Sequence, residues 1–252
     1  MSNRPLRRSR HRRLDLQSEW ERSAVGFITW ARKPQHDSYW LFHRDVFLEL
    51  VPPPRGRTLD LGSGEGRLSR DLKALGHDVA AVDGAPTMVA AAREADPGLE
   101  VHLADAASLP FEDGSFASVV ALMSLQDIDD LAGAIREVAR VLGPRGVFCF
   151  AIVHPISSSG TFVDDTPESA FLIEGSYFEP SYYVDDFSRD GVEVTMASVH
   201  RPLQDYTECL AGEGFVIERL REPSVPEHAI WNERSRRWQR LPPFLHVRAS
   251  KP

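Results

Sequence analysis

Short apolar runs alternate with helical patterns through the middle of this chain. We expect strands at residues 58–61, 78–82, 100–103, 116–122 and 147–153, and helices at residues 67–75, 86–95 and 129–142. The last helix is the clearest, because Leu131, Ile135 and Val138 recur at helical spacing before Gly143 and Pro144 end the pattern. Strands that alternate with helices form a parallel sheet covered by crossover helices. The sequence therefore predicts an α/β fold.

Two amphipathic segments precede this alternation. Helices are expected at residues 14–32 and 36–50, where apolar and aromatic residues recur at helical spacing. The prolines at 52–54 then interrupt the helical pattern, because proline fixes φ and supplies no backbone donor. We interpret residues 14–50 as an N-terminal helical cap on the sheet.

A long segment rich in Ser, Asp, Gly and aromatic residues follows the fifth strand. It covers residues 154–201, with one expected strand at 192–200 after the turn at Asp190 and Gly191. Connections longer than about 12–15 residues are commonly functional, so we interpret this insertion as a substrate lid. A helix near 202–211 and strands near 215–220 and 244–249 are expected to complete the fold.

Length and charge limit the classes of function. A single hydrophobic core stops growing near roughly 250–300 residues, so we expect one domain at residues 14–252. The formal net charge of -8 repels a polyanion and disfavours nucleic acid as a partner. The arginine-rich residues 1–13 are interpreted as a disordered basic tail. Cys149 and Cys209 lack metal-ligand spacing, so no metal is expected. Without a signal peptide or a membrane span, we expect a cytoplasmic location.

A glycine-rich turn follows the first predicted strand, in Leu59-Asp60-Leu61-Gly62-Ser63-Gly64-Glu65-Gly66. Glycine lets the backbone bend sharply and approach a ligand closely. A dinucleotide fingerprint would place glycine where Arg67 stands. Asp60 and Glu65 would repel a pyrophosphate but attract a cationic ligand. Asp83 ends the second strand, where a carboxylate accepts hydrogen bonds from ribose hydroxyls.

These motifs give the chain a resemblance to the class I S-adenosylmethionine-dependent methyltransferases. The similarity runs from about residue 58 to 155, through TLDLGSGEG, AVDGAPTMVAAAR, VHLADAASLPFEDGSF, MSLQDIDD and AIREVARVLGPRGVFCF. It implies a Rossmann-like sheet of seven strands, mostly parallel with an antiparallel last strand and with helices on both faces. It also implies S-adenosyl-L-methionine as the cofactor.

The resemblance assigns roles to residues at the strand ends. Gly62 and Gly64 would line the methionine portion of the cofactor, and Asp83 would hold its ribose. Met88 would pack on the adenine, while Asp105 would take the adenine amino group. The complete predicted cofactor set is Asp60, Gly62, Ser63, Gly64, Asp83, Gly84, Met88, Asp105, Ala106 and Ser124.

The sequence identifies the catalytic residues and the residues that bind the methyl acceptor less clearly. Methyl transfer needs no catalytic group beyond positioning, but a base helps a hydroxyl or ammonium acceptor. His154 ends the fifth strand and is our candidate base, with further candidates at His200, Tyr177, Tyr182 and Tyr183. We expect Tyr39, Trp40, Tyr177 and His200 to bind the substrate. Aromatic side chains in the cap and the insertion, including Trp30 and Phe162, suit a planar or apolar small molecule.

The sequence leaves the acceptor, the methylated atom and the oligomeric state open. Rival interpretations are a nicotinamide-dependent oxidoreductase, a methyltransferase acting on RNA or protein, and a protein that binds the cofactor without turnover. The oxidoreductase is disfavoured by Arg67 and by the acidic loop.

Overall fold

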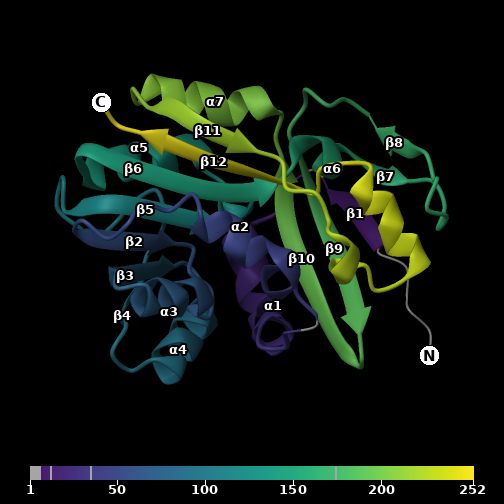
Figure 1. Ribbon diagram of the computed structural model, residues 1–252, viewed down its shortest axis with the longest axis horizontal. Helices are drawn as coiled ribbons and strands as arrows, with labels where there is room; N and C mark the ends of the chain where they lie inside the picture. Colours follow the sequence, from purple (N-terminus) through teal and green to yellow (C-terminus); the bar gives the residue numbers. More distant parts are fainter. Residues whose placement is uncertain (1–6, 12, 35, 174) are drawn as a thin grey trace.

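The computed structural model describes residues 7–11, 13–34, 36–173 and 175–252. Its largest sheet is built from β2 (Arg57–Leu61), β3 (Asp78–Asp83), β4 (Glu100–Leu103), β5 (Phe116–Leu122), β6 (Leu142–Val153), β11 (Val216–Arg221) and β12 (Phe244–Ser250). Their order across the sheet is β11-β12-β6-β5-β2-β3-β4 (Figure 1). β2 to β6 pair in parallel, whereas β12 is antiparallel to both β6 and β11. The predicted seven-stranded Rossmann-like sheet is confirmed.

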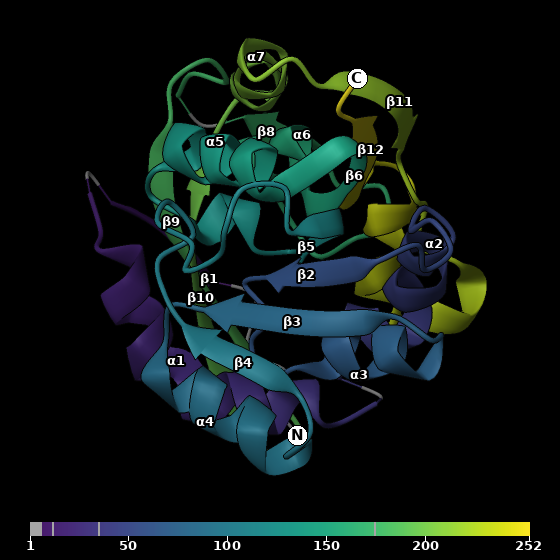
Figure 2. The same ribbon diagram turned by 90° about the vertical axis from the view of Figure 1, so that its left-hand side faces the viewer.

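Helices cover both faces of this sheet. They are α3 (Arg67–Ala74), α4 (Pro86–Ala95), α5 (Leu131–Val141) and α7 (Leu203–Gly212), close to the predicted ranges. In Figure 2, α5 and α7 lie at the top and α3 and α4 at the bottom. Asp130 caps α5 by accepting a hydrogen bond from the backbone of Gly133, and Pro86 occupies the first turn of α4.

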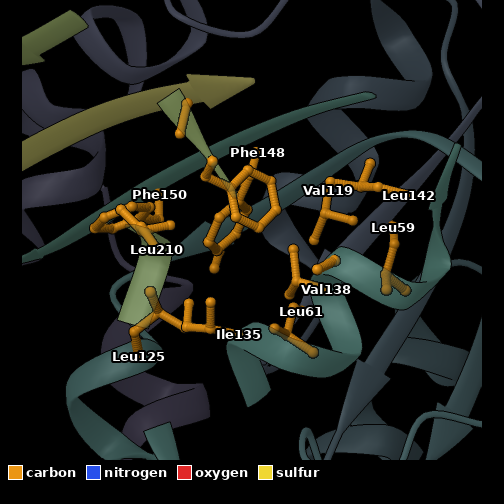
Figure 3. Close-up of a cluster of buried hydrophobic side chains, with 14 of the residues drawn as sticks. Leu59, Leu61, Val119, Leu125, Ile135, Val138, Leu142, Phe148, Phe150 and Leu210 are labelled. Atoms are coloured by element: carbon orange, nitrogen blue, oxygen red, sulfur yellow. The ribbon is translucent and has the colours of Figure 1, made fainter. Parts of the chain in front are cut away.

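Two apolar clusters hold the helices on the sheet. Phe148 and Phe150 of β6 pack toward Ile135 of α5 and Leu210 of α7 (Figure 3). Their neighbour Cys149 belongs to the cluster on the other face, which contains Leu72 of α3. Successive residues of a strand point to opposite faces, so one continuous apolar run serves both layers. This double-sided burial fixes the strand ends that carry the cavity described below.

The predicted N-terminal cap consists of three elements. They are α1 (Leu16–Ala31), the π-helical turn η1 (Tyr39–His43) and α2 (Arg44–Leu48). Asp15 caps α1 by accepting a hydrogen bond from the backbone of Ser18. Through Ala24 and its neighbours, α1 packs against Ala85 and Met88 at the start of α4. The helix predicted at residues 36–50 is shorter and less regular in the structure, where η1 and α2 take its place.

The insertion contains more regular structure than the sequence predicts. It forms α6 (Pro155–Ser159), β7 (Gly160–Phe162), β8 (Phe171–Ile173), β9 (Ser181–Arg189) and β10 (Val192–His200). The last strand matches the predicted one, and β9 and β10 form a long antiparallel hairpin (Figure 1). Asp190 and Gly191 turn the hairpin with positive φ angles of 49° and 75°.

A strand from the N-terminal segment joins this hairpin. β1 (Arg7–His11) pairs antiparallel with β9, which makes a three-stranded sheet of β1, β9 and β10 that we call the outer sheet. The expectation of a disordered tail at residues 1–13 is therefore wrong for residues 7–11, while residues 1–6 and 12 lie outside the described residues. Arg8 donates to both carboxylate oxygens of Asp185, at 2.8 and 2.6 Å, and also bonds the carbonyl oxygens of Ser157 and Gly160. Ion pairing and backbone hydrogen bonds hold β1 against β9, so no apolar pattern in the sequence indicates this strand.

The C-terminal part adds two short helical turns before β12. These are η3 (Glu227–Ala229) and η4 (Glu233–Gln239), and a third turn, η2 (Leu125–Asp127), follows β5. Asn232 begins η4 as a capping box with Ser235. Trp231 and Trp238 bring this segment to the cavity described next.

Candidate functional site

A cavity of about 610 Å³ lies at the carboxyl ends of β2, β3, β4 and β5. The volume is within the range of small-molecule sites, and open α/β sheets bind ligands at this edge. Residues of α1 and of the outer sheet also line the cavity, including Trp20, Phe27, Tyr183 and Ser198. The cavity thus has one wall from the central sheet and another from the cap and the outer sheet.

All of the predicted cofactor residues line this one cavity. They are Asp60, Gly62, Ser63, Gly64, Asp83, Gly84, Met88, Asp105, Ala106 and Ser124. They come from four successive strand ends that are separated by up to about sixty residues in the chain. The sheet topology brings them together, as the resemblance implies.

The glycine-rich turn depends on close backbone approach. Gly62 has a φ of 71°, and its backbone N–H donates to the carbonyl oxygen of Val82 at 2.8 Å. A Cβ atom on Gly62 would lie 2.3 Å from the Cβ atom of Ser124. Ser124 in turn donates from its hydroxyl to the carbonyl oxygen of Leu61 at 2.7 Å. This hydrogen bond and the close approach at Gly62 therefore hold the ends of β2 and β5 together at the cavity wall.

Asp83 organises the same turn from the end of β3. Its carboxylate accepts hydrogen bonds from the backbone N–H groups of Gly64, at 2.8 Å, and Ala85, at 2.9 Å. Burial raises the pKa of Asp83 above its ordinary value, and these two hydrogen bonds partly oppose the rise. The remaining lone pairs of the carboxylate are available to hydroxyl donors in the cavity.

Asp60 is the second carboxylate of this wall, and unlike the half-buried Asp83 it is fully buried. The hydroxyl of Ser69 donates to its Oδ2 at 2.6 Å, while its Oδ1 has no hydrogen-bond partner among the described residues. Burial raises the pKa of Asp60 to about 7, and the nearby Asp83 adds to the rise. A ligand that carries positive charge or N–H donors would satisfy this oxygen.

Glu65 differs from Asp60 in its partners. Both of its carboxylate oxygens accept hydrogen bonds from Arg70, at 2.8 and 2.9 Å, and Arg32 lies 3.3 Å away. Its charge is compensated within the protein. The cation-attracting role expected of both carboxylates therefore falls on Asp60.

The raised pKa of Asp60 predicts a pH-dependent affinity for a cationic ligand. Between its ordinary pKa of 3.8 and about 7, the folded protein holds a proton that the unfolded chain has lost. Ionisation of this carboxyl therefore costs folding stability as pH rises through that range. A cationic ligand prefers the ionised form, so we expect the affinity for S-adenosylmethionine to increase with pH up to about 7 and then level off.

Calorimetric titration at several pH values checks this expectation. Asp60→Asn should flatten the profile, because the amide cannot ionise. A profile in the variant that still rises as in the natural protein would assign the titration to another group.

The candidate base His154 does not line the cavity. Its ring begins α6, where Nδ1 accepts a hydrogen bond from the backbone of Ile156 at 3.1 Å. Nε2 lies 2.9 Å from a carboxylate oxygen of Glu222. Burial lowers the pKa of His154 despite this neighbour. Both ring nitrogens are occupied in capping and pairing, so the geometry favours a structural role over proton transfer.

The four expected substrate residues also lie outside the cavity lining. Tyr39 is buried and donates to Asp71, and the indole of Trp40 donates to the carbonyl oxygen of Ala31 at 2.7 Å. His200 bonds Ser158 and the carbonyl oxygen of Tyr177, and the Tyr177 hydroxyl accepts from the backbone of Leu203 at 3.2 Å. These side chains hold the cap and the insertion together. Of the further candidates, Tyr183 does line the cavity.

Most residues of the second cavity wall, which the cap and the outer sheet form, were not predicted from the sequence. Unforeseen lining residues are Arg8, Gln17, Trp20, Phe27, Gln126, Asp127, Asp185, Phe187, Met196, Ser198, Trp231, Trp238 and Phe244. The alternation of polar and apolar residues in β9 and β10 is the one local signal for this wall. This alternation identifies one face of the β9–β10 hairpin, but the pairing with β1 determines that this face lines the cavity.

Comparison with known proteins agrees with the fold. A crystal structure of an S-adenosylmethionine-dependent methyltransferase from Mesorhizobium loti superposes with a TM-score of 0.69 at 25% identity, covering 87% of this chain and all of that one. Residues 59–150 match a family model described as a methyltransferase domain. Residues 59–150 therefore resemble a methyltransferase domain, and the fold is that of an S-adenosylmethionine-dependent methyltransferase. The [4+2]-cyclase SpnF shares the fold of this methyltransferase domain, with a TM-score of 0.63 at 17% identity over 94% of the chain and 97% of that protein.

Curated relatives match the methyltransferase domain over part of their length. A malonyl-[acyl-carrier protein] O-methyltransferase of Halorhodospira halophila is 36% identical over 136 residues, which are 50% of this chain and 46% of that protein. A demethylmenaquinone methyltransferase of Thermus thermophilus is 42% identical over 109 residues, which are 41% and 49% of the two chains. The chain thus spans about half the length of the curated relatives it matches. Among the described residues, no helix combines the length and the apolar character needed to cross a bilayer.

Proposed function

We propose that this protein transfers a methyl group from S-adenosylmethionine to a small-molecule acceptor. The observation that carries the proposal is the set of hydrogen-bond acceptors around the glycine turn. Asp60 is a buried and Asp83 a half-buried carboxylate in the cavity wall, and neither forms an ion pair within the described residues. The hydroxyl of Ser63, also in this wall, has no hydrogen-bond partner there. A ligand with an ammonium group, a sulfonium and ribose hydroxyls matches these acceptors.

Each strand end has a distinct part in this proposal. When bound, S-adenosylmethionine supplies an electrophilic methyl group on a positively charged sulfur. Asp83 would hold the ribose hydroxyls, and Asp60 would compensate the positive charge. Met88 would pack on the adenine, and Asp105 with the Ala106 backbone would receive its amino group. Enclosure of the cavity by α1 and the outer sheet would exclude water from the transfer.

The acceptor class rests on the second wall and not on the relatives. The relatives' names refer to malonyl-[acyl-carrier protein] and to demethylmenaquinone, which are chemically unlike, so their shared domain does not specify the acceptor. The cavity volume of about 610 Å³ and its aromatic lining suit a small molecule beside the cofactor. Arg8 and Arg10 bond groups of the insertion, so these two arginines are poorly placed for the phosphates of a nucleic acid.

Titration of Asp83→Asn with S-adenosylmethionine tests the proposal. We expect the affinity to fall by about 1–3 kcal/mol, because a charge-assisted pair of hydrogen bonds to the ribose is weakened. Asp78→Asn is the matched control, since Asp78 begins the same strand and its side chain is exposed. Calorimetry on both variants and on the natural protein measures the difference.

The same titration distinguishes the proposed function from a nicotinamide-dependent oxidoreductase. NADH should not bind, because the turn lacks the third glycine of the dinucleotide fingerprint and is acidic. Tight binding of NADH, or equal affinities of Asp83→Asn and Asp78→Asn for S-adenosylmethionine, would contradict the proposal.

A further inference from the structure

The second wall of the cavity contains its own group of buried polar side chains. In the outer sheet, Tyr183 of β9 lies opposite Ser198 of β10. Residues two positions along on the same face, Asp185 and Met196, also line the cavity. The alternate residues point the other way, and Ala197 packs there on Leu16 of α1. Tyr183, Asp185, Met196 and Ser198 therefore present one face of the outer sheet to the cavity.

Asp127 connects this face to the end of β5. It belongs to η2, lines the cavity and accepts a hydrogen bond from the hydroxyl of Ser198 at 2.6 Å. The amide nitrogen of Gln126 donates to its other oxygen at 3.2 Å. Among the described residues, Asp127 forms no ion pair. Burial raises its pKa well above the ordinary value, which is the expected response of a carboxyl without a cationic partner.

The basic side chain that favours the ionised form of Asp127 is hydrogen-bonded elsewhere. Arg201 contributes favourably to the ionised form of Asp127, but its guanidinium bonds backbone carbonyl oxygens of the η2 segment. These oxygens belong to Leu125, Ile128 and Asp129, at 3.4, 2.6 and 3.0 Å. Arg201 thus holds the turn that carries Asp127 and leaves its carboxylate uncompensated.

Two further polar atoms beside Asp127 have no partner. Oε1 of Gln126 and the hydroxyl oxygen of Tyr183 form no hydrogen bond within the described residues, although both side chains are more than nine-tenths buried. Buried polar atoms without partners are rare in proteins and indicate a missing ligand or solvent. Both residues line the cavity, so these atoms are available to a molecule inside it.

The chemistry of these atoms selects a class of acceptor. A carboxylate and an amide oxygen can only accept hydrogen bonds, and the Tyr183 hydroxyl can also accept. An ammonium group offers three N–H donors, and its positive charge would compensate the negative charge of the carboxylate. We propose that Asp127, Gln126 and Tyr183 form the acceptor subsite and bind the ammonium group of a small amine with an apolar body. Met196 and Phe187 on the same wall would contact that body.

This inference rests on the proposed function, and it predicts that a cationic group is preferred over an anionic one at this position. Arg8 lies over the Tyr183 ring, with its Cζ atom 4.3 Å from the ring centroid, but it is paired with Asp185 and bonds the carbonyl oxygens of Ser157 and Gly160. Hydroxyl compounds would satisfy the hydrogen bonds but not the charge. An amine should therefore bind more tightly than an alcohol of the same shape.

A pair of matched probes tests the subsite. The protein is first saturated with S-adenosylhomocysteine, so that the cofactor wall is filled, and is then titrated calorimetrically with phenethylamine or with 2-phenylethanol. We expect phenethylamine to bind at least about tenfold more tightly, the scale of one charge-assisted interaction. Asp127→Asn should remove that preference while keeping the hydrogen bond to Ser198. Tyr183→Phe should weaken the amine by a few-fold.

Asp186→Asn is the control for loss of a negative charge. Asp186 also lines the cavity, but its side chain is exposed to solvent, and we expect the amine preference to persist. Equal affinities of the natural protein for the two probes, or an unchanged preference in Asp127→Asn, would overturn the inference. So would a loss of S-adenosylhomocysteine affinity in Asp127→Asn as large as in Asp83→Asn, because Asp127 would then serve the cofactor. Failure of the natural protein to bind S-adenosylhomocysteine would instead refute the proposed function.

Discussion

Gly62→Ala should abolish measurable cofactor binding and destabilise the fold by about 2–5 kcal/mol, the sum of a left-handed backbone penalty and an overpacking penalty. The φ of 71° is unfavourable for alanine. The new Cβ atom would also lie 2.3 Å from the Cβ atom of Ser124, a distance that forces β2 and β5 apart. Because the turn between these strands carries the cofactor wall, the affinity for S-adenosylmethionine should fall by at least about a hundredfold. Urea unfolding and calorimetry measure the two effects.

Gly191→Ala separates backbone strain from the steric clash. Gly191 has a nearly identical φ of 75°, but no atom lies within 4 Å of the position of its Cβ. We expect a loss of about 1 kcal/mol and unchanged cofactor affinity. Adding Ser124→Gly to Gly62→Ala removes the clashing atom and should restore part of the stability. If Gly62→Ala were no more harmful than Gly191→Ala, close contact between the two strand ends would be refuted.

Arg8→Ala should destabilise the protein by about 3–5 kcal/mol, although it alters a residue close to the N-terminus. The substitution leaves the carboxylate of Asp185 without its cation, where the side chain is only 11% exposed. It also removes the donors to the carbonyl oxygens of Ser157 and Gly160. Cofactor affinity should change by less than about threefold, because Arg8 contacts the outer sheet and α6 and not the glycine turn.

Arg22→Ala provides the control for loss of an arginine in the same part of the chain. Its side chain is 67% exposed and pairs with Glu19 one helical turn away, so the loss should stay below about 0.5 kcal/mol. Urea unfolding of both variants measures the difference in their free energies of unfolding. A tolerated Arg8→Ala would mean that the Arg8 side chain and its pair with Asp185 contribute little to stability.

The central sheet and its cavity could be predicted because several local signals agree there. Continuous apolar runs, glycines and strand-end carboxylates such as Asp60 and Asp83 all point to one edge of the sheet. His154 shows the limit of this reasoning. It does end a strand, but Pro155 begins a helix at once, and the imidazole turns to cap that helix.

The second wall could not be predicted because its contacts join distant segments. Tyr183 and Asp185 lie in a strand with mixed polar and apolar residues, whose cavity face is defined only after β1 and β10 pair with it. Tyr39 was expected at the substrate because it is aromatic and lies in the cap. The irregular turn η1 instead directs its hydroxyl to Asp71. Local periodicity does not encode such turns.

The pairing of β1 with β9 also has a consequence for biosynthesis. Arg8 and Asp185 are 177 positions apart, so Arg8 emerges from the ribosome long before its partner exists. At about 5–20 residues per second, the interval is roughly 10–35 s. During that time the central sheet has most of its strands and can form, whereas the outer sheet cannot close. The nascent protein should therefore acquire its cofactor wall first, and the basic N-terminal segment stays open to chaperones or proteases until the hairpin arrives.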